Sequence, residues 1–192
     1  MTYPFSNGDV LQASDMNAVG LHLITPTSVT GGTLDGATVN ITNGATSLTV
    51  SGVFSSNFDN YRLLVHVGPT SAITGISMQF GTTTGNVYYG SYAYALHSDT
   101  STTNSPQSGV NSLYITDGDT YAYAESLADV TIFSPYIAQR TTIMGNHYGR
   151  GFSGWQAGQV ATSDQYTSFV LFPASGNFAS GGTIRVYGYS NG

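Results

Sequence analysis

The side chains that could carry chemistry are few, and the sequence scatters them. The chain has four histidines, at His22, His66, His97 and His147. Their separations match none of the short spacings that bring two histidines onto one metal ion. The ten acidic residues are dispersed as well, except for Asp117 and Asp119 in an Asp-Gly-Asp sequence. That sequence is first of all typical of a turn, with a cation contact or a pair of catalytic carboxylates as the alternatives.

Motifs for covalent catalysis do not occur in the sequence either. Cysteine is missing altogether, which removes thiol chemistry, disulfides and thiolate metal ligands. The run Gly151-Phe152-Ser153-Gly154 is one residue short of the spacing that activates a serine at a nucleophile elbow. There is no glycine-rich phosphate loop and no dinucleotide fingerprint. We therefore expect no catalytic residue, no metal and no cofactor, and a structural or binding protein instead of an enzyme.

The composition is that of a weakly charged β protein. Only 7% of the 192 residues are charged, lysine is absent, and the chain has 24 glycines and 14 tyrosines. Helix-rich enzymes use far more Glu, Lys and Arg. The net charge of −6 and the lack of basic clusters argue against a nucleic-acid partner. No apolar run approaches the ~18 residues of a membrane span, so we expect no membrane insertion.

From residue 46 onward, apolar residues recur at every second position, which is the pattern of half-buried antiparallel strands. The clearest runs are 61–67, 76–80, 128–132 and 184–189. Turn-forming residues cluster between the runs, including a long stretch at 99–109. About eight to ten short strands without a long helix predict an all-β fold, an antiparallel β-sandwich of jelly-roll-like form.

Two segments before this domain have a different character. Residues 1–24 combine an Asn-Gly turn with a short helix that Ser14 would cap and Gly20 would end. A helix that short needs a surface to dock on. Residues 25–45 are rich in Thr, Gly and Asn and indicate a linker or an extended arm. The predicted organisation is a docking segment at 1–24, an arm or linker at 25–45 and a β-sandwich domain at 46–192.

Aromatic and polar side chains suited to recognition concentrate in the segment 145–156. It contains Asn146, His147, Tyr148, Arg150 and Trp155, the only tryptophan of the chain. Aromatic rings bind the C–H face of a sugar, and amides and charges bind its hydroxyls, so this loop is a candidate glycan or receptor contact. The alternative is a long hairpin loop whose Trp155 and Phe152 plug the end of the sandwich.

Tyrosines form a second candidate surface. The sequence Ser-Tyr-Ala-Tyr-Ala at 91–95 is echoed by Thr-Tyr-Ala-Tyr-Ala at 120–124. The echo predicts two similar strands, each with two tyrosines on one face and alanines on the other. Tyrosine serves ligand recognition, core packing and subunit packing alike. The candidate contacts from this region are Tyr92, Tyr94, Asp117, Asp119, Tyr121 and Tyr123.

Three stretches of the chain resemble tail fibre and related tail proteins of tailed bacteriophages. Residues 4–17, PFSNGDVLQASDMN, resemble the Phe-x-x-Gly-Asp-Val-Leu-x-Ala-x-Asp-Leu-Asn start common in these proteins, with Met16 where Leu is usual. Residues 46–65 are similar to the first strands of their β domains, and residues 181–189 to the final strand. The resemblance implies that residues 1–24 anchor the chain to a virion. The anchoring residues would be Phe5, Val10, Leu11 and Met16.

What the resemblance implies is a virion structural protein, a tail fibre or tail-tip protein that docks by its N-terminus and presents its β domain to the host surface. Its partners would be other virion proteins and further copies in a homotrimer, with a host surface glycan as candidate ligand. The alternative is a capsid decoration or head-fibre protein that clamps the shell with the arm at 25–45. An envelope-degrading enzyme and a free lectin-like module are the lesser alternatives.

Overall fold

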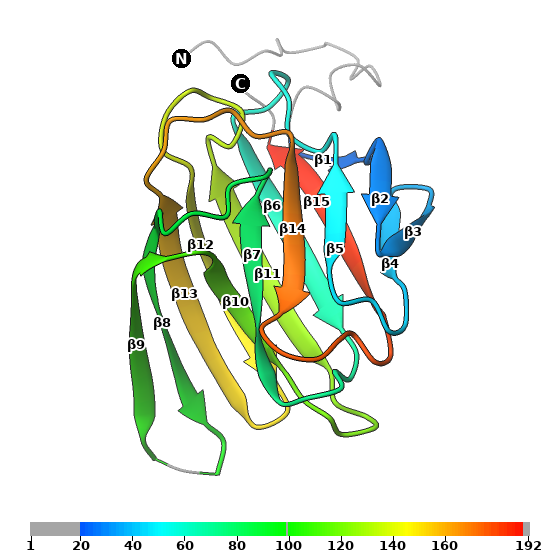
Figure 1. Cartoon of the computed structure of the whole chain (residues 1–192), viewed down its shortest axis with the longest axis vertical. Helices are drawn as coiled ribbons and strands as arrows, with labels where there is room; N and C mark the ends of the chain where they lie inside the picture. The colour runs from blue at the N-terminus through cyan, green and yellow to red at the C-terminus, as the bar shows by residue number, and fades with distance from the viewer. Residues whose placement is uncertain (1–19, 99, 190–192) are drawn as a thin grey trace, which may run out of the picture.

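The computed structural model describes residues 20–98 and 100–189, and every regular element among them is a β-strand. The strands form two antiparallel sheets, a larger one of ten strands and a smaller one of five (Figure 1). The predicted all-β antiparallel sandwich is confirmed. The predicted helical turn after Ser14 lies outside the described residues.

In both sheets, strands that are far apart in the sequence lie side by side. The larger sheet runs β3 (Gly32–Asp35), β4 (Thr38–Ile41), β15 (Gly182–Tyr189), β6 (Asn60–Val67), β11 (Ser126–Phe133), β12 (Thr142–Gly149), β13 (Phe152–Val160), β8 (Tyr88–Leu96) and β9 (Thr102–Val110). Its tenth strand, β1 (Leu21–Ile24), pairs with the later part of β15, and β4 pairs with the earlier part. The smaller sheet runs β10 (Leu113–Gly118), β7 (Thr74–Phe80), β14 (Ser168–Pro173), β5 (Leu48–Ser51) and β2 (Ser28–Thr30).

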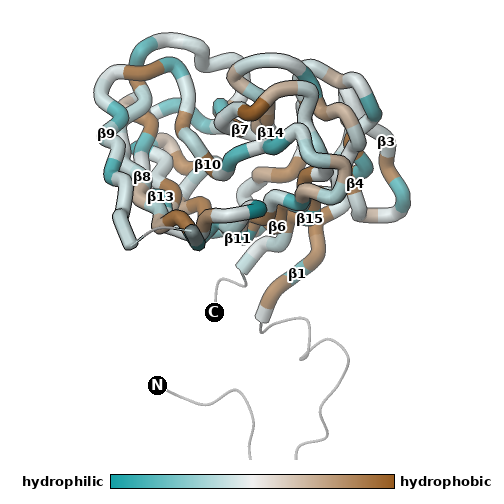
Figure 2. Tube along the Cα trace, turned by 90° about the horizontal axis from the view of Figure 1, so that it is seen from below, coloured by the Kyte–Doolittle hydropathy of each residue, from teal (hydrophilic) through white to brown (hydrophobic). Residues whose placement is uncertain are grey.

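Alternation along the strands builds the core between the two layers. Figure 2 shows β7, β10 and β14 in one layer and β6, β11 and β15 in the other. On β6, Tyr61, Leu63 and Val65 point inward and are buried, and the residues between them face outward. Met78 on β7 and Phe169 on β14 meet them from the smaller sheet. Each such side chain contributes about 1.5–3 kcal/mol on burial, so this cluster holds the layers together.

Residues 25–45 belong to the sandwich, and the interpretation as an arm or linker is wrong for them. They form β2, β3 and β4, and β2 extends the smaller sheet by pairing with β5. Val39 and Ile41 on β4 are buried in the core. The glycines of this segment serve tight connections: Gly31 has φ +79°, and a side chain there would collide with the backbone of Ser47. In β4, inward- and outward-facing residues alternate over only four positions, and the Thr- and Gly-rich composition of the segment does not make this alternation apparent.

Two stretches predicted as loops are strands, and one predicted strand is a loop. Most of the long turn expected at 99–109 is the edge strand β9. The segment 145–156 forms most of the β12–β13 hairpin, whose turn is only Arg150-Gly151, with φ +139° at Gly151. These sequences are polar because an edge strand and the outer face of a sandwich sheet are open to solvent. The echo at 120–124 lies in the β10–β11 connection, and only 91–95 is a strand.

The sandwich has two different ends. At one end β1 begins and β15 finishes, because Leu21 pairs with Tyr189. At the opposite end β15 begins, with Gly182 beside Val67 of β6. The connections β8–β9, β10–β11 and β12–β13 lie at this second end (Figure 1). We refer to it as the loop end, and it lies opposite the end at which β1 begins and β15 finishes.

Candidate functional site

Connections from different strand pairs meet at the loop end. The backbone N–H of His97, directly after β8, donates to the carbonyl of Gly151 in the β12–β13 turn at 2.7 Å. In the same turn, Nη1 of Arg150 lies 3.4 Å from Oδ2 of Asp119, directly after β10. The β6–β7 connection joins through the backbone N–H of Thr70, which donates to the Asp119 carbonyl at 2.9 Å. The fold thus gathers segments that are far apart in sequence.

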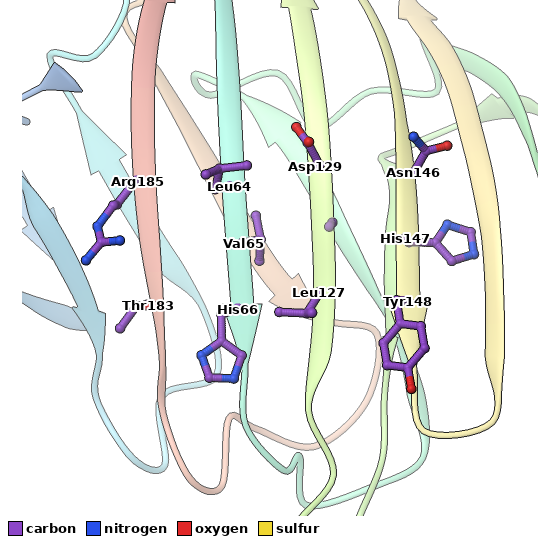
Figure 3. Close-up of a pocket in the computed structure, with 11 residues that line it drawn as sticks. Leu64, Val65, His66, Leu127, Asp129, Asn146, His147, Tyr148, Thr183 and Arg185 are labelled. Atoms are coloured by element: carbon purple, nitrogen blue, oxygen red, sulfur yellow. The ribbon is translucent and has the colours of Figure 1, made fainter. Parts of the chain in front are cut away.

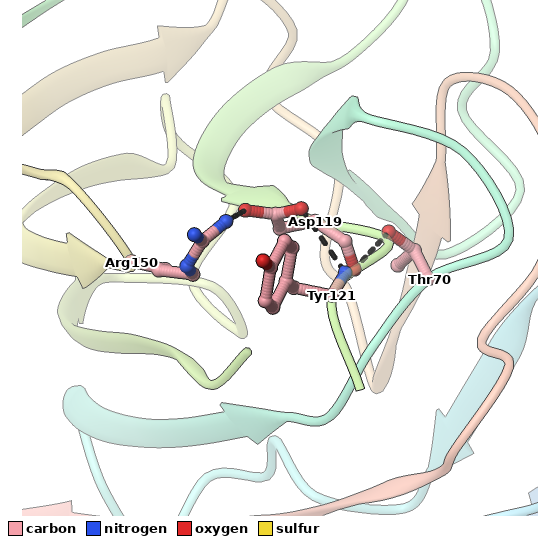
Figure 4. A network of polar contacts seen from close by, with 4 residues as sticks. All are labelled: Thr70, Asp119, Tyr121 and Arg150. Atoms are coloured by element: carbon pink, nitrogen blue, oxygen red, sulfur yellow. Dashed lines mark hydrogen bonds and ion pairs between the residues drawn. The ribbon is translucent and has the colours of Figure 1, made fainter. Parts of the chain in front are cut away.

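Asp119 organises this corner of the loop end (Figure 4). Its Oδ1 accepts the backbone N–H of Tyr121 at 3.2 Å, which is the hydrogen bond of an Asx turn and shapes the start of the β10–β11 connection. Its Oδ2 faces Arg150 on the other side. An exposed ion pair of this kind stabilises a fold by less than about 1 kcal/mol, so its effect here is to orient the guanidinium.

Arg150 and two tyrosines make the surface that this corner presents. The Arg150 guanidinium lies over the ring of Tyr121, 3.6 Å from its centroid, while the arginine side chain stays 49% exposed. Tyr121 is 57% exposed and Tyr123 is 93% exposed. A guanidinium held between a ring and a carboxylate can donate hydrogen bonds to hydroxyl or carbonyl oxygens, and the open rings can stack on an apolar face. The arrangement suits recognition and contains no nucleophile with an adjacent base.

Three other predicted contact residues face the interior. Tyr92 stacks on Tyr114 of β10 with 4.0 Å between ring centroids, and His147 meets Tyr114 edge-on at 5.3 Å. Tyr94 approaches the ring of Phe152 to 5.8 Å between centroids. His147 is only 3% exposed, so the predicted surface contact is wrong for this residue. For Tyr92 and Tyr94, the structure favours the packing role that the sequence left open.

This interior cluster contains buried side-chain nitrogens without hydrogen-bond partners among the described residues, namely His147 Nε2 and Gln156 Nε2. His147 Nδ1 and Gln156 Oε1 lie 2.9 Å apart. Burial lowers the pKa of His147, and the contact with Gln156 opposes that shift. Burial raises the pKa of Asp117 to about 6, and the nearby hydroxyl of Tyr114 opposes it. The interior therefore favours the uncharged forms of both groups.

Asn146, Tyr148 and Trp155 lie on the outer face of the larger sheet. Asn146 and Trp155 are direct cross-strand neighbours on β12 and β13. Tyr148 is 49% exposed and Trp155 is 48% exposed. Trp155 therefore does not plug the end of the sandwich, and that interpretation is wrong for it. Phe152 does face inward, against His147 and Tyr94.

Sequence reasoning missed residues that the structure brings into these clusters. Arg62 donates to both carboxylate oxygens of Asp129, with Nε–Oδ1 at 2.8 Å and Nη2–Oδ2 at 2.5 Å. Alternation places both side chains on outward faces, but only the order of strands in the sheet makes them neighbours. Tyr114 lies in a run of consecutive buried residues, 113–116, where a register shift interrupts the pairing with β7. That run carries no periodic signal.

The predicted docking segment contributes no described residue to these clusters. The predicted anchor residues lie outside the described part of the chain, and their role stays a prediction: Phe5, Val10, Leu11 and Met16. Within 20–98 and 100–189, no group of three His, Asp or Glu side chains is placed to hold a metal ion. The same residues include no helix with the length and hydrophobicity needed to cross a membrane.

Comparison with models of protein families, with curated proteins and with solved structures finds no match to the chain.

Proposed function

We propose that the protein is a structural protein of a tailed-phage virion, of tail-fibre or tail-tip type, that recognises the host surface. In this proposal residues 1–20 dock on other virion proteins, since Leu21–Ile24 of the predicted docking segment form β1. The copies assemble as a homotrimer, and the loop end faces the host. The observation that carries the proposal is that the two ends of the sandwich differ. The first and last strands meet at one end, and the corner of Asp119, Tyr121 and Arg150 lies at the other.

Two further features support this assignment. Tyr123 and Ile73, which are 93% and 77% exposed, both lie in connections at the loop end. Large apolar side chains gain free energy when a partner covers them, and aromatic residues and arginine are the types that dominate binding surfaces. The resemblance of residues 4–17 to the start of phage tail proteins supports docking through the N-terminus.

The alternative of a capsid decoration or head-fibre protein rests on an arm at 25–45 that reaches neighbouring subunits. Because β2, β3 and β4 lie within the sandwich, that observation no longer favours it. The copy number in purified particles separates the two functions. A few to a few dozen copies at one vertex support the tail position, and hundreds of copies support the shell.

A deletion of residues 2–19 tests the docking role. It ends before β1, whose pairing with β15 a deletion through residue 24 would remove. We expect the shortened protein to fold and to oligomerise as the full chain does, and to be missing from purified particles in an immunoblot. Incorporation at the wild-type level would contradict docking by this segment.

Arg150→Ala tests recognition by the loop end, and Arg140→Ala is the matched control. Both arginines are exposed, but Arg140 lies in the β11–β12 connection at the opposite end. We expect particles with Arg150→Ala to adsorb to host cells about tenfold more slowly, because the substitution removes a central guanidinium of the contact. Particles with Arg140→Ala should adsorb like wild type. Equal adsorption of the two variants would refute recognition through this corner.

A further inference from the structure

The outer face of the larger sheet holds a trough that the loop-end contact does not use. Three hollows, of about 410, 570 and 510 Å³, follow one another across this face, and Figure 3 shows the first. The first and second share Asp129 and Asn146. The second and third share Met144 and Ala157. The three hollows therefore adjoin one another, and we refer to them together as the trough.

Strand register sets the order of side chains along the trough. Leu64 pairs with Asp129, Asp129 with Asn146, and Asn146 with Trp155. Figure 3 shows the first three of these side chains one beside the next on β6, β11 and β12. Directly opposed side chains of antiparallel strands are about 5 Å apart, so the row spans about 15 Å. That length accommodates several linked small rings, not a single small molecule.

The trough alternates apolar surface with planar polar groups. Met144 is 55% exposed and Trp155 is 48% exposed. Among the described residues, neither the Asn146 amide nor the Trp155 indole N–H has a hydrogen-bond partner, so both are available to a ligand. Arg62 and Asp129 are joined by two hydrogen bonds, which cancels the charge of the second hollow. Oxygens of this carboxylate and N–H groups of this guanidinium still have hydrogen-bonding capacity.

We infer that the trough binds an uncharged oligosaccharide. Trp155 stacks on the C–H face of a sugar ring, and Asn146 with the Arg62–Asp129 pair bonds the ring hydroxyls. Within the trough the Arg62–Asp129 pair is neutral, and Arg185 of the first hollow donates to the hydroxyl of Thr38. The net charge of −6 of the whole chain disfavours an anionic ligand. An extended peptide gains affinity from main-chain bonds at a free sheet edge, whereas the strands below the trough are paired on both sides. The inference rests on the proposed function for one point, that the saccharide belongs to the host surface.

Trp155 itself reports on the test, because it is the only tryptophan of the chain. The full chain is applied to an array of neutral and acidic bacterial surface oligosaccharides, and the neutral glycan with the highest signal is titrated while Trp155 emission is recorded. We expect a saturable change in emission. Asn146→Ala should weaken binding about tenfold or more, since a lost hydrogen bond to a ligand is worth about that factor. Asn86→Ala removes an exposed amide outside the trough and should bind like wild type.

Three outcomes would overturn the inference. The first is no binding to any neutral glycan on the array, or binding that leaves Trp155 emission unchanged. The second is equal glycan affinity of Asn146→Ala and Asn86→Ala. The third is that Trp155 emission changes with the protein concentration but not with added glycan, and that sedimentation shows the Trp155→Ala variant no longer forms oligomers. That result would show that a second copy of the chain covers the trough.

Particle adsorption separates this inference from the proposed function. If no glycan binds in the trough while Arg150→Ala still slows adsorption, the inference fails and the proposed function stands. If Asn146→Ala loses glycan binding while the 2–19 deletion leaves incorporation intact and Arg150→Ala leaves adsorption intact, the trough stands and the proposed function fails.

Discussion

Asp117 is a largely buried carboxyl near the end of β10, and its ionised form should destabilise the fold at neutral pH. Burial raises its pKa from the ordinary 3.8 to about 6, with the Tyr114 hydroxyl opposing the shift. A difference of that size corresponds to about 3 kcal/mol at pH 7. Because β10 is an edge strand and water reaches the group in part, the observable effect is about 1–2 kcal/mol. Asp117→Asn keeps the shape and removes the charge, so it should raise the free energy of unfolding at pH 7 by that amount.

The direction of the pH dependence follows from the same shift. The folded protein binds the Asp117 proton more tightly than the unfolded chain does, so this group lowers wild-type stability as the pH rises from about 4 to about 6. In urea unfolding followed by circular dichroism, the gain from Asp117→Asn should be small at pH 4 and largest at pH 7. Asp164→Asn, at an exposed carboxylate, is the matched control and should show no such trend. The reasoning is refuted if the gain is the same at both pH values, or if Asp117→Asn is less stable than wild type at pH 7.

Two further substitutions test the packing. Gly145→Ala would place a Cβ 2.2 Å from the carbonyl oxygen of Asp129, so it should force β11 and β12 apart and lower the melting temperature sharply. Gly85→Ala, where the nearest atom would be Cγ1 of Val87 at 3.9 Å, should leave the melting temperature almost unchanged, and equal melting of the two variants would contradict the close approach. Tyr61→Phe removes a hydroxyl that accepts the Ser55 N–H at 2.8 Å and donates to the Ser55 carbonyl at 3.0 Å. It should cost about 1–3 kcal/mol in urea unfolding, and an unchanged midpoint would refute that role.

The fold class could be predicted from those strands that bury one face and expose the other. Tyr61, Leu63 and Val65 show the reason, since their two-residue alternation is a local pattern that already states which face is buried. The prediction failed where polar residues form strands. Residues 99–109 look like a loop because most of them form an edge strand that keeps polar residues. Residues 25–45 look like an arm because their strands are only three or four residues long.

The candidate contacts divide in the same way. Residue types alone indicated the chemistry, which is aromatic, amide and guanidinium groups suited to recognition. They could not indicate which side chains are accessible to a ligand. His147 points to the inner face of β12, whereas its neighbours Asn146 and Tyr148 point to the outer face. The segment 145–156 therefore supplies His147, Phe152 and Gln156 to the interior. It supplies Asn146, Tyr148 and Trp155 to the outer face, and Arg150 to the loop end.

By itself, the sequence determined that this chain is a β-sandwich, low in charge, without cysteine and poor in reactive groups, because composition and alternation are local properties. Only the tertiary structure decided that Arg150 lies over Tyr121 and that Leu64, Asp129, Asn146 and Trp155 share one row. Those neighbours come from strand order and register, which pair residues far apart in the chain. No local pattern encodes such pairings, since they depend on how all the strands pack at once.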